Sequence, residues 1–208
     1  MTKNTKVNAA ILIIGNEILS GRTQDTNTTT LATWLNSIGV KVEEVRVIPD
    51  VEKIIVETLN ALRKKNNYVF TTGGIGPTHD DITAQSVAKA FGRKYEIHKE
   101  AYKILELYYK PGEFNEGRQK MTWMPENAKL IYNPTSGAPG FSVENVFCLP
   151  GVPSILKSML GALKNRIVGG EPILSHTISL KTVESEIANS LTKVQDQNKD
   201  VEIGSYPF

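Results

Sequence analysis

Apolar segments along the chain predict β-strands. Residues 7–14 form a nearly continuous apolar run, which suits a strand that is covered on both faces. Residues 40–48 alternate between apolar and polar side chains, and residues 68–72 form a third, shorter run. Two later runs, residues 141–143 and 146–149, flank a short polar turn and predict a hairpin.

Helices are predicted after the first three strands, because apolar residues recur there at the three- and four-residue spacing of one helix face. In chain order these residues are Leu31, Trp34, Leu35 and Ile38; Val51, Ile54, Ile55, Thr58 and Leu62; and Ala84, Val87, Ala88 and Phe91. Strand and helix therefore alternate over the first 92 residues, which predicts an α/β fold with a parallel sheet and helices on both faces. Ligands of such sheets bind beyond the carboxyl ends of the strands.

The rest of the chain predicts two more helices, a hinge and a small α+β lobe. In order, these are helices over 99–109 and 153–167, a hinge at 169–172, a strand over 173–180, a helix over 183–194 and the start of a strand over 201–204. We therefore divide the chain into a domain of residues 1–168 and a lobe of residues 171–208. Because its last element lacks an ordinary end, we expect this lobe to be incomplete.

Composition excludes several classes of protein. The 208 residues are 40% hydrophobic and 22% charged, with a formal net charge of +2, so charge alone suggests neither a nucleic-acid partner nor a membrane partner. The single cysteine rules out an internal disulfide, and the three histidines show no zinc-ligand spacing. No apolar run approaches the ~20 residues that span a bilayer, and no signal peptide is evident. We expect a cytoplasmic protein.

The densest chemical signal is the glycine-rich segment that follows the strand at 68–72. Gly73, Gly74 and Gly76, with Ile75 between them, would let backbone N–H groups approach an anion closely, and the next helix would add its dipole. The segment lacks the Gly-Lys-Ser/Thr of a P-loop and the third glycine of the dinucleotide fingerprint. It is either a phosphate-binding loop or simply a tight strand-to-helix turn.

Two adjacent acids, Asp80 and Asp81, stand at the predicted start of that helix. Both would suit the helix dipole, and Thr78 with Asp81 has the spacing of a capping box. Capping requires only one acid, whereas a second acid would repel a bound phosphate unless a cation intervened. Since Mg²⁺ binds one or two carboxylates together with phosphate oxygens, the pair is also consistent with a metal-bridged phosphate site.

Four residues near the carboxyl ends of the first two strands are further candidates. Glu17 and Arg22 either pair and order their loop, or they orient a ligand and contact a phosphate. Asn27 is a candidate helix cap, and Asp50 either caps a helix or adds a carboxylate to the same cleft. Farther along, the small, rigid segment around Gly137, Pro139 and Gly140 is either a turn or a loop in contact with a flat ligand.

Four segments together resemble one known family. GNEILSGRTQDTN (15–27), GGIGPTHDDIT (73–83), GAPGF (137–141) and LPGVPS (149–154) resemble the molybdopterin-binding domain, and most closely the N-terminal domain of competence/damage-inducible protein A. The resemblance implies a three-layer α/β/α sandwich with a mostly parallel sheet. It also implies a cleft for a phosphorylated pterin or an adenine dinucleotide, and a homo-oligomer, either dimer or trimer.

The resemblance also implies an activity and a set of site residues. Relatives adenylylate molybdopterin using Mg²⁺ and ATP, with an essential acid that aligns with Asp81, whereas the closest branch resembles metal-dependent pyrophosphatases of ADP-ribose-like dinucleotides. Asp50 matches the acid after the second strand, and Arg118 and Gln119 match a pair expected beside the ligand. This chain departs from the branch at Lys120, where alanine is common, and at Ile155, where a glutamate is common.

We weigh three hypotheses from these observations. The first is a diphosphate-cleaving enzyme in which Gly74, Ile75 and Gly76 hold a phosphate, Asp80 and Asp81 hold Mg²⁺ or a similar ion, and Arg22 neutralises charge. The second is a non-hydrolytic module that binds molybdopterin or a nucleotide, which the isoleucine at 155 favours. The third is a scaffold whose cleft binds no phosphate ligand. The candidate ligand contacts are Glu17, Asn27, Gly73, Gly74, Ile75, Gly76, Thr78, Arg118, Gln119, Gly137, Pro139 and Gly140, and the candidate metal ligands are Asp50, Asp80 and Asp81.

Overall fold

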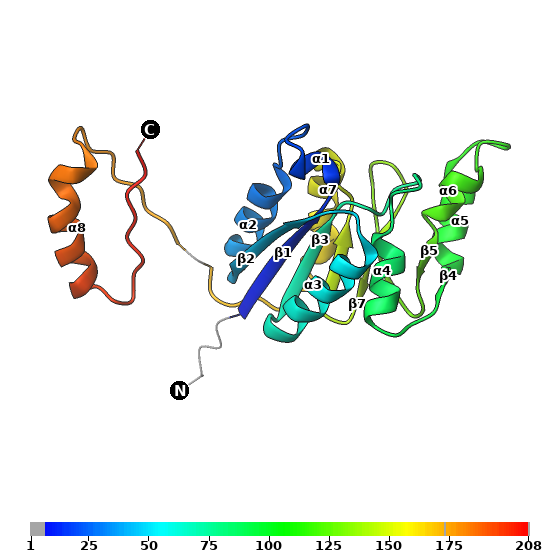
Figure 1. Ribbon diagram of the computed structural model, residues 1–208, viewed down its shortest axis with the longest axis horizontal. Coiled ribbons are helices and arrows are strands. Elements are labelled where there is room, and N and C mark those ends of the chain that lie inside the picture. The colour runs from blue at the N-terminus through cyan, green and yellow to red at the C-terminus, as the bar shows by residue number, and fades with distance from the viewer. Residues whose placement is uncertain (1–6, 173, 208) are drawn as a thin grey trace. The chain divides into compact units, whose positions relative to one another are not determined.

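A six-stranded sheet forms the centre of the first part of the chain (Figure 1). The computed structural model describes residues 7–172 and 174–207, and the chain divides into two units, up to residue 173 and from residue 174. The strand order is β2-β1-β3-β8-β7-β6, with bounds β1 Val7–Ile14, β2 Val40–Ile48, β3 Tyr68–Thr72, β6 Lys129–Ile131, β7 Gly140–Val143 and β8 Val146–Leu149. The strands β2, β1, β3 and β8 run parallel, whereas β7 is antiparallel to both of its neighbours.

Helices cover both faces of this sheet, so the predicted three-layer α/β/α sandwich with a mostly parallel sheet is confirmed. The helices α3 (Glu52–Lys65) and α4 (Thr83–Ala90) pack on one face, where Leu59 and Val87 meet Leu12 of β1 in one apolar cluster. The helices α2 (Asn27–Ser37) and α7 (Pro153–Leu163) pack on the other, where Leu31 and Leu160 share a second cluster with β1 and β3.

The continuous apolar run of β1 is explained by its central place in the sheet. Residues 9–14 are each at most 3% exposed, because neighbouring strands flank β1 and helices cover both of its faces. Full burial of each large aliphatic side chain contributes about 1.5–3 kcal/mol. Phe70 of β3 stacks on Phe147 of β8 with ring centroids 5.2 Å apart, which ties the third parallel strand to the fourth.

A smaller lobe, residues 91–128, lies between α4 and β6 in the chain and is distinct from the C-terminal lobe expected over residues 171–208. It contains a two-stranded antiparallel sheet of β4 (Tyr95–Ile97) and β5 (Trp123–Pro125), with the helices α5 (Lys99–Tyr108) and α6 (Glu116–Lys120) between these strands in the chain. The helix α5 agrees with the predicted helix over 99–109. The strands were not predicted, because a strand of three residues is too short to show an alternating pattern.

The second unit differs from the expected α+β lobe. It contains the helix α8 (Glu184–Gln197), close to the predicted helix, but the described residues from 174 to 207 form no strand. The strands predicted over 173–180 and 201–204 are therefore wrong for the residues described, and residue 173 lies outside them. Leu174 and Ile178 are 83% and 82% exposed, so these residues have neither the packing nor the backbone partner that a strand requires. Among the described residues, none of the helices is long and apolar enough to cross a membrane.

Candidate functional site

The turn after β3 needs glycine for steric reasons. Gly73 and Gly74 have φ angles of +97° and +69°, which L side chains rarely adopt. A Cβ on Gly73 would lie 2.1 Å from the carbonyl oxygen of Ile14, and one on Gly74 would lie 2.1 Å from Oγ1 of Thr83. The Thr83 hydroxyl and N–H in turn donate to the carbonyls of Gly73 and Gly74, both at 2.9 Å. The turn therefore requires both glycines whether or not a ligand binds.

Backbone donors are nevertheless available at the same turn. The N–H of Gly73 donates to the carbonyl of Leu149 at 3.2 Å. Within the residues that the structure describes, the N–H groups of Gly74, Ile75 and Gly76 donate to no acceptor. All three residues are half-buried and follow the carboxyl end of β3, so three successive backbone donors without an acceptor lie in this turn. Such clusters of backbone donors bind anions.

Thr78 organises the two acids that follow these glycines. Its N–H donates to Oδ2 of Asp81 at 2.8 Å, and its hydroxyl donates to Oδ1 of Asp80 at 2.7 Å. The helix α4 begins only at Thr83, so this contact closes a turn before the helix and the capping box is only half formed. Asp80 is exposed and Asp81 is half-buried, and Oδ2 of Asp81 lies 2.7 Å from the position a Cβ would take on Gly76. The Asp81 carboxylate thus lies against the glycine loop.

The loops after β1 and β2 bring two more carboxylates to this edge of the sheet. Oδ2 of the half-buried Asp50 accepts a hydrogen bond from the N–H of Asn16 at 2.9 Å, at the start of the short helix α1 (Asn16–Leu19). Burial raises the pKa of Asp50, and the charges of Glu17 and Asp80 raise it further. The convergence that we predicted for the three strand ends is therefore observed.

The hydrogen bond from Thr78 lowers the pKa of Asp80, and the positive charge of Lys120 acts in the same direction. Asp80 is thus an exposed carboxylate held in its ionised form. Among the described residues, however, no group of three or more histidine, cysteine or acidic side chains lies close enough to hold a metal ion by itself. These acids fit a hard cation only if ligand oxygens complete its coordination, which is the usual arrangement for Mg²⁺.

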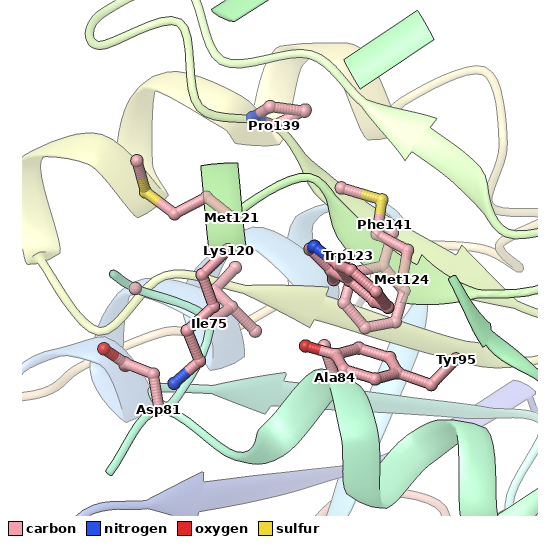
Figure 2. Close-up of a pocket in the computed structure, with 11 residues that line it drawn as sticks. Ile75, Asp81, Ala84, Tyr95, Lys120, Met121, Trp123, Met124, Pro139 and Phe141 are labelled. Atoms are coloured by element: carbon pink, nitrogen blue, oxygen red, sulfur yellow. The ribbon is translucent and has the colours of Figure 1, made fainter. Parts of the chain in front are cut away.

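A small cavity separates the glycine loop from the smaller lobe (Figure 2). Asp81 and Lys120 lie near each other in its lining, Tyr95 and Trp123 lie apart from them, and Gly76 also lines the cavity (Figure 2). Its volume is about 10 Å³, which is room for about one water-sized sphere. The rings of Tyr95 and Trp123, whose centroids lie 5.4 Å apart, line this small space. A pterin or nucleotide would require these side chains to move.

Arg118 and Gln119 directly precede Lys120, which lines the cavity, but their own side chains contact residues outside the cavity lining. The Arg118 guanidinium stacks on the Tyr109 ring at 4.1 Å and donates to the carbonyl of Glu113, while the Gln119 amide donates to the carbonyl of Phe114 at 3.0 Å. Both side chains therefore order the segment 109–115. In this structure the cavity is lined instead by the residue that follows them, Lys120.

Arg22 and Asn27 are also away from the cavity lining. Arg22 is exposed, and within the described part of the chain no ion pair joins it to Glu17. The Asn27 amide is buried and donates to Oγ1 of Thr72 and to the carbonyl of Gly151, both at 2.8 Å. Asn27 thus joins the start of α2 to the ends of β3 and β8, and Asp25, rather than Asn27, accepts the N–H bonds at the start of that helix.

In the small-residue segment at 137–140, only Pro139 lines the cavity. Gly137, with φ +74°, is covered by the Tyr108 ring, since a Cβ would lie 2.8 Å from that ring. Gly140 is required by strand packing, because a Cβ there would lie 2.4 Å from the carbonyl of Cys148. These two glycines therefore have structural roles that their sequence pattern alone did not show.

Sequence reasoning missed most of the cavity lining. Lys120 was noted only as a departure from relatives, and Tyr95, Trp123 and Met124 were not considered. They belong to β4, α6 and β5, whose short lengths leave no periodic pattern. Tyr95 and Trp123 are far apart in the sequence, so no local pattern indicates that they line one cavity.

Comparisons with known proteins agree with this architecture. A family model described as a probable molybdopterin binding domain matches residues 10–176, and one described as the middle domain of FAD synthase matches residues 172–208. A protein from Archaeoglobus fulgidus is 39% identical over 197 residues, covering 95% of this chain and 84% of that protein. A protein from Pyrobaculum calidifontis is 35% identical over 210 residues, covering 96% and 80% respectively.

Solved structures show the same relationship. The protein CinA from Thermoplasma acidophilum, described as having unknown function, is 32% identical with a TM-score of 0.73, covering 79% of this chain and 99% of that one. The molybdopterin biosynthesis enzyme MoaB from Thermus thermophilus shares the fold at 19% identity and a TM-score of 0.51, covering 76% of this chain and 89% of that one. The chain therefore belongs to the molybdopterin-binding domain family and is CinA-like.

Proposed function

We propose that this chain binds a phosphorylated ligand at the glycine loop and, with a divalent cation, hydrolyses the diphosphate of an ADP-ribose-like dinucleotide. One observation carries the proposal: three successive backbone N–H groups have no acceptor in the described structure, and the Asp81 carboxylate lies against the last of these residues, Gly76. Donors of this kind suit a phosphate, and the adjoining acids suit the cation that a phosphate requires.

The electrostatics of the site support a cation. Glu17 and Asp80 already raise the pKa of Asp50, so the carboxylates at this edge repel one another. A phosphate entering this field would be repelled as well unless a positive charge lay between. When bound, a divalent cation polarises the phosphorus centre and lowers the pKa of an attacking water. We assign its protein ligands to Asp80 and Asp81, with Asp50 close enough to contribute charge.

The chain's own residues position the ligand in this proposal. The N–H groups of Gly74 to Gly76 hold one phosphate. Thr78 binds Asp80 and Asp81 by hydrogen bonds, which keeps both carboxylates near that phosphate. The rings of Tyr95 and Trp123 offer flat surfaces for a base or a pterin once the cavity opens. Arg22 is exposed in the loop after α1 and is not among the residues that line the cavity.

The test is release of AMP from ADP-ribose by purified protein in Mg²⁺ and in EDTA. We expect AMP only with Mg²⁺, and a loss of roughly 100-fold or more in Asp81→Asn, since electrostatic groups of this kind are typically worth that much. Asp200→Asn, in the second unit, is the matched control and should keep full activity. Turnover unchanged in Asp81→Asn would refute the assignment.

A second function, binding without hydrolysis, is favoured by one observation. Ile155, in the first turn of α7, packs against the apolar cluster under that helix, at a position where the resemblance described above implies that a glutamate is common. That position therefore offers no carboxylate to a cation. Saturable binding of molybdopterin or ADP-ribose with no AMP release would select this function, and absence of any binding would favour a scaffold. We likewise propose that the chain assembles as a dimer or trimer, which sedimentation would test.

A further inference from the structure

Lys120 links the smaller lobe to the glycine loop. It is the last residue of α6, and its ammonium donates to the carbonyl oxygen of Thr78, 42 residues earlier in the chain. The Lys120 side chain lines the small cavity together with Gly76 and Asp81 (Figure 2). Its side chain therefore forms part of the cavity wall next to the glycine loop.

Lys120 is the only cationic residue among those that line the cavity, and Asp81 is the only anionic one. Arg118, on the same helix, is committed to the Tyr109 ring and the Glu113 carbonyl. The Lys120 ammonium has three donors, and a neutral carbonyl is a weaker partner for it than an anion would be.

We propose that Lys120 binds the phosphate of the ligand directly, by exchanging the carbonyl of Thr78 for a phosphate oxygen. A lysine side chain is flexible enough to make this exchange without moving the backbone. The same rotation would shift the side chain that forms part of the cavity wall, so a single movement both changes the cavity and brings a positive charge to the phosphate. The inference rests on the proposed phosphate site and identifies the residue that supplies its cationic charge.

A consequence is that part of the ligand affinity should not require a divalent cation. The carboxylates of Asp80 and Asp81 stay hydrogen-bonded to Thr78, while Lys120 offsets their charge next to the phosphate. Removing the charge of Lys120 should therefore weaken binding most when no metal is present. A hydrogen bond to a charged group accounts for roughly 10- to 100-fold in affinity.

The experiment is calorimetric titration of ADP-ribose, and separately of inorganic pyrophosphate, in EDTA and in Mg²⁺. Lys120→Met keeps the stem and removes the charge, Lys120→Arg keeps a cation, and Lys103→Met changes an exposed lysine of α5 as the matched control. In EDTA we expect Lys120→Met to bind roughly 10- to 100-fold more weakly than wild type, and the other two variants to bind within about 3-fold of it. Mg²⁺ should reduce the deficit of Lys120→Met.

A measurement on the unaltered chain guards against misfolding of the variants. Acetylation of lysines with acetic anhydride, read by mass spectrometry, should be several-fold slower at Lys120 when ADP-ribose is present, and unchanged at Lys103. Equal binding by wild type and Lys120→Met in EDTA, or no protection of Lys120, would overturn the role of Lys120 and leave the phosphate site standing. Failure of wild type to bind either ADP-ribose or pyrophosphate in both buffers would overturn the site and the role together.

Discussion

The glycine at position 73 offers a sharp test of why this loop has its sequence. In Gly73→Ala the added methyl would lie 2.1 Å from the Ile14 carbonyl, on a residue with φ +97°. Gly112 provides a matched control, because its φ is +83° and nothing lies within 4 Å of its would-be Cβ. The control thus carries the backbone strain alone, whereas Gly73→Ala carries strain together with a clash against backbone.

The magnitudes follow from these two contributions. A left-handed backbone conformation destabilises a residue with an L side chain by about 1–2 kcal/mol, and an extra methyl forced into packed structure destabilises the fold by about 1–3 kcal/mol. We therefore expect Gly112→Ala to lower the free energy of unfolding by about 1–2 kcal/mol and Gly73→Ala by about 2–5 kcal/mol. At ~2–4 °C per kcal/mol, the larger loss lowers Tm by roughly 4–20 °C.

Urea titration followed by tryptophan fluorescence is the assay. Both tryptophans, Trp34 and Trp123, belong to the first unit, so the signal reports on the sheet that contains the turn. If the two variants lose the same free energy of unfolding to within about 0.5 kcal/mol, which is the size of an ordinary surface effect, the clash at position 73 is refuted. If the clash is real, loss of ligand binding in Gly73→Ala would say nothing about phosphate contacts, because the turn itself would be disrupted.

Three further outcomes follow from the structure. Because burial and the charges of Glu17 and Asp80 raise the pKa of Asp50, ionisation of Asp50 destabilises the fold, and Asp50→Asn should raise Tm at pH 7. The gain in Tm should shrink as the pH falls through the raised pKa towards the ordinary 3.8, and a gain independent of pH would contradict this. Burial raises the pKa of Cys148 to about 12, so Ellman's reagent should label one thiol per chain only after denaturation, and immediate labelling of the folded chain would be inconsistent with its place in β8. Loss of the Arg118 stack on Tyr109 should let a glutamate-specific protease cleave at Glu113 about 2- to 5-fold faster in Arg118→Ala than in wild type, and an unchanged rate would mean that the stack does not order this segment.

The sandwich itself could be predicted because its elements are long and periodic. The first strand is almost continuously apolar over residues 7–14, and the following helix repeats apolar residues from Leu31 to Ile38, so both period and order were visible. The convergence of Asp50 with Asp80 was predictable too, since parallel strands end at one edge. These inferences required only local pattern and topology.

The smaller lobe and the role of each glycine could not be predicted in this way. Tyr95 and Trp123 pair across strands of three residues, and that pairing depends on contacts between segments far apart in the chain. Gly73 and Gly137 look equivalent in sequence, but one avoids a carbonyl of β1 and the other a tyrosine ring. The expected strands after residue 173 failed because apolar alternation without a partner strand does not make a sheet.

The most direct test of the phosphate site is a crystal structure of the protein soaked with ADP-ribose and Mg²⁺. We expect diphosphate density between the N–H groups of Gly74 to Gly76 and the Asp81 carboxylate, with the cation against Asp80 or Asp81. We also expect the Lys120 ammonium to have left the carbonyl of Thr78 for the phosphate. A ligand bound away from this loop, or an empty loop with Lys120 still on Thr78 at saturating ligand, would contradict the proposed phosphate site.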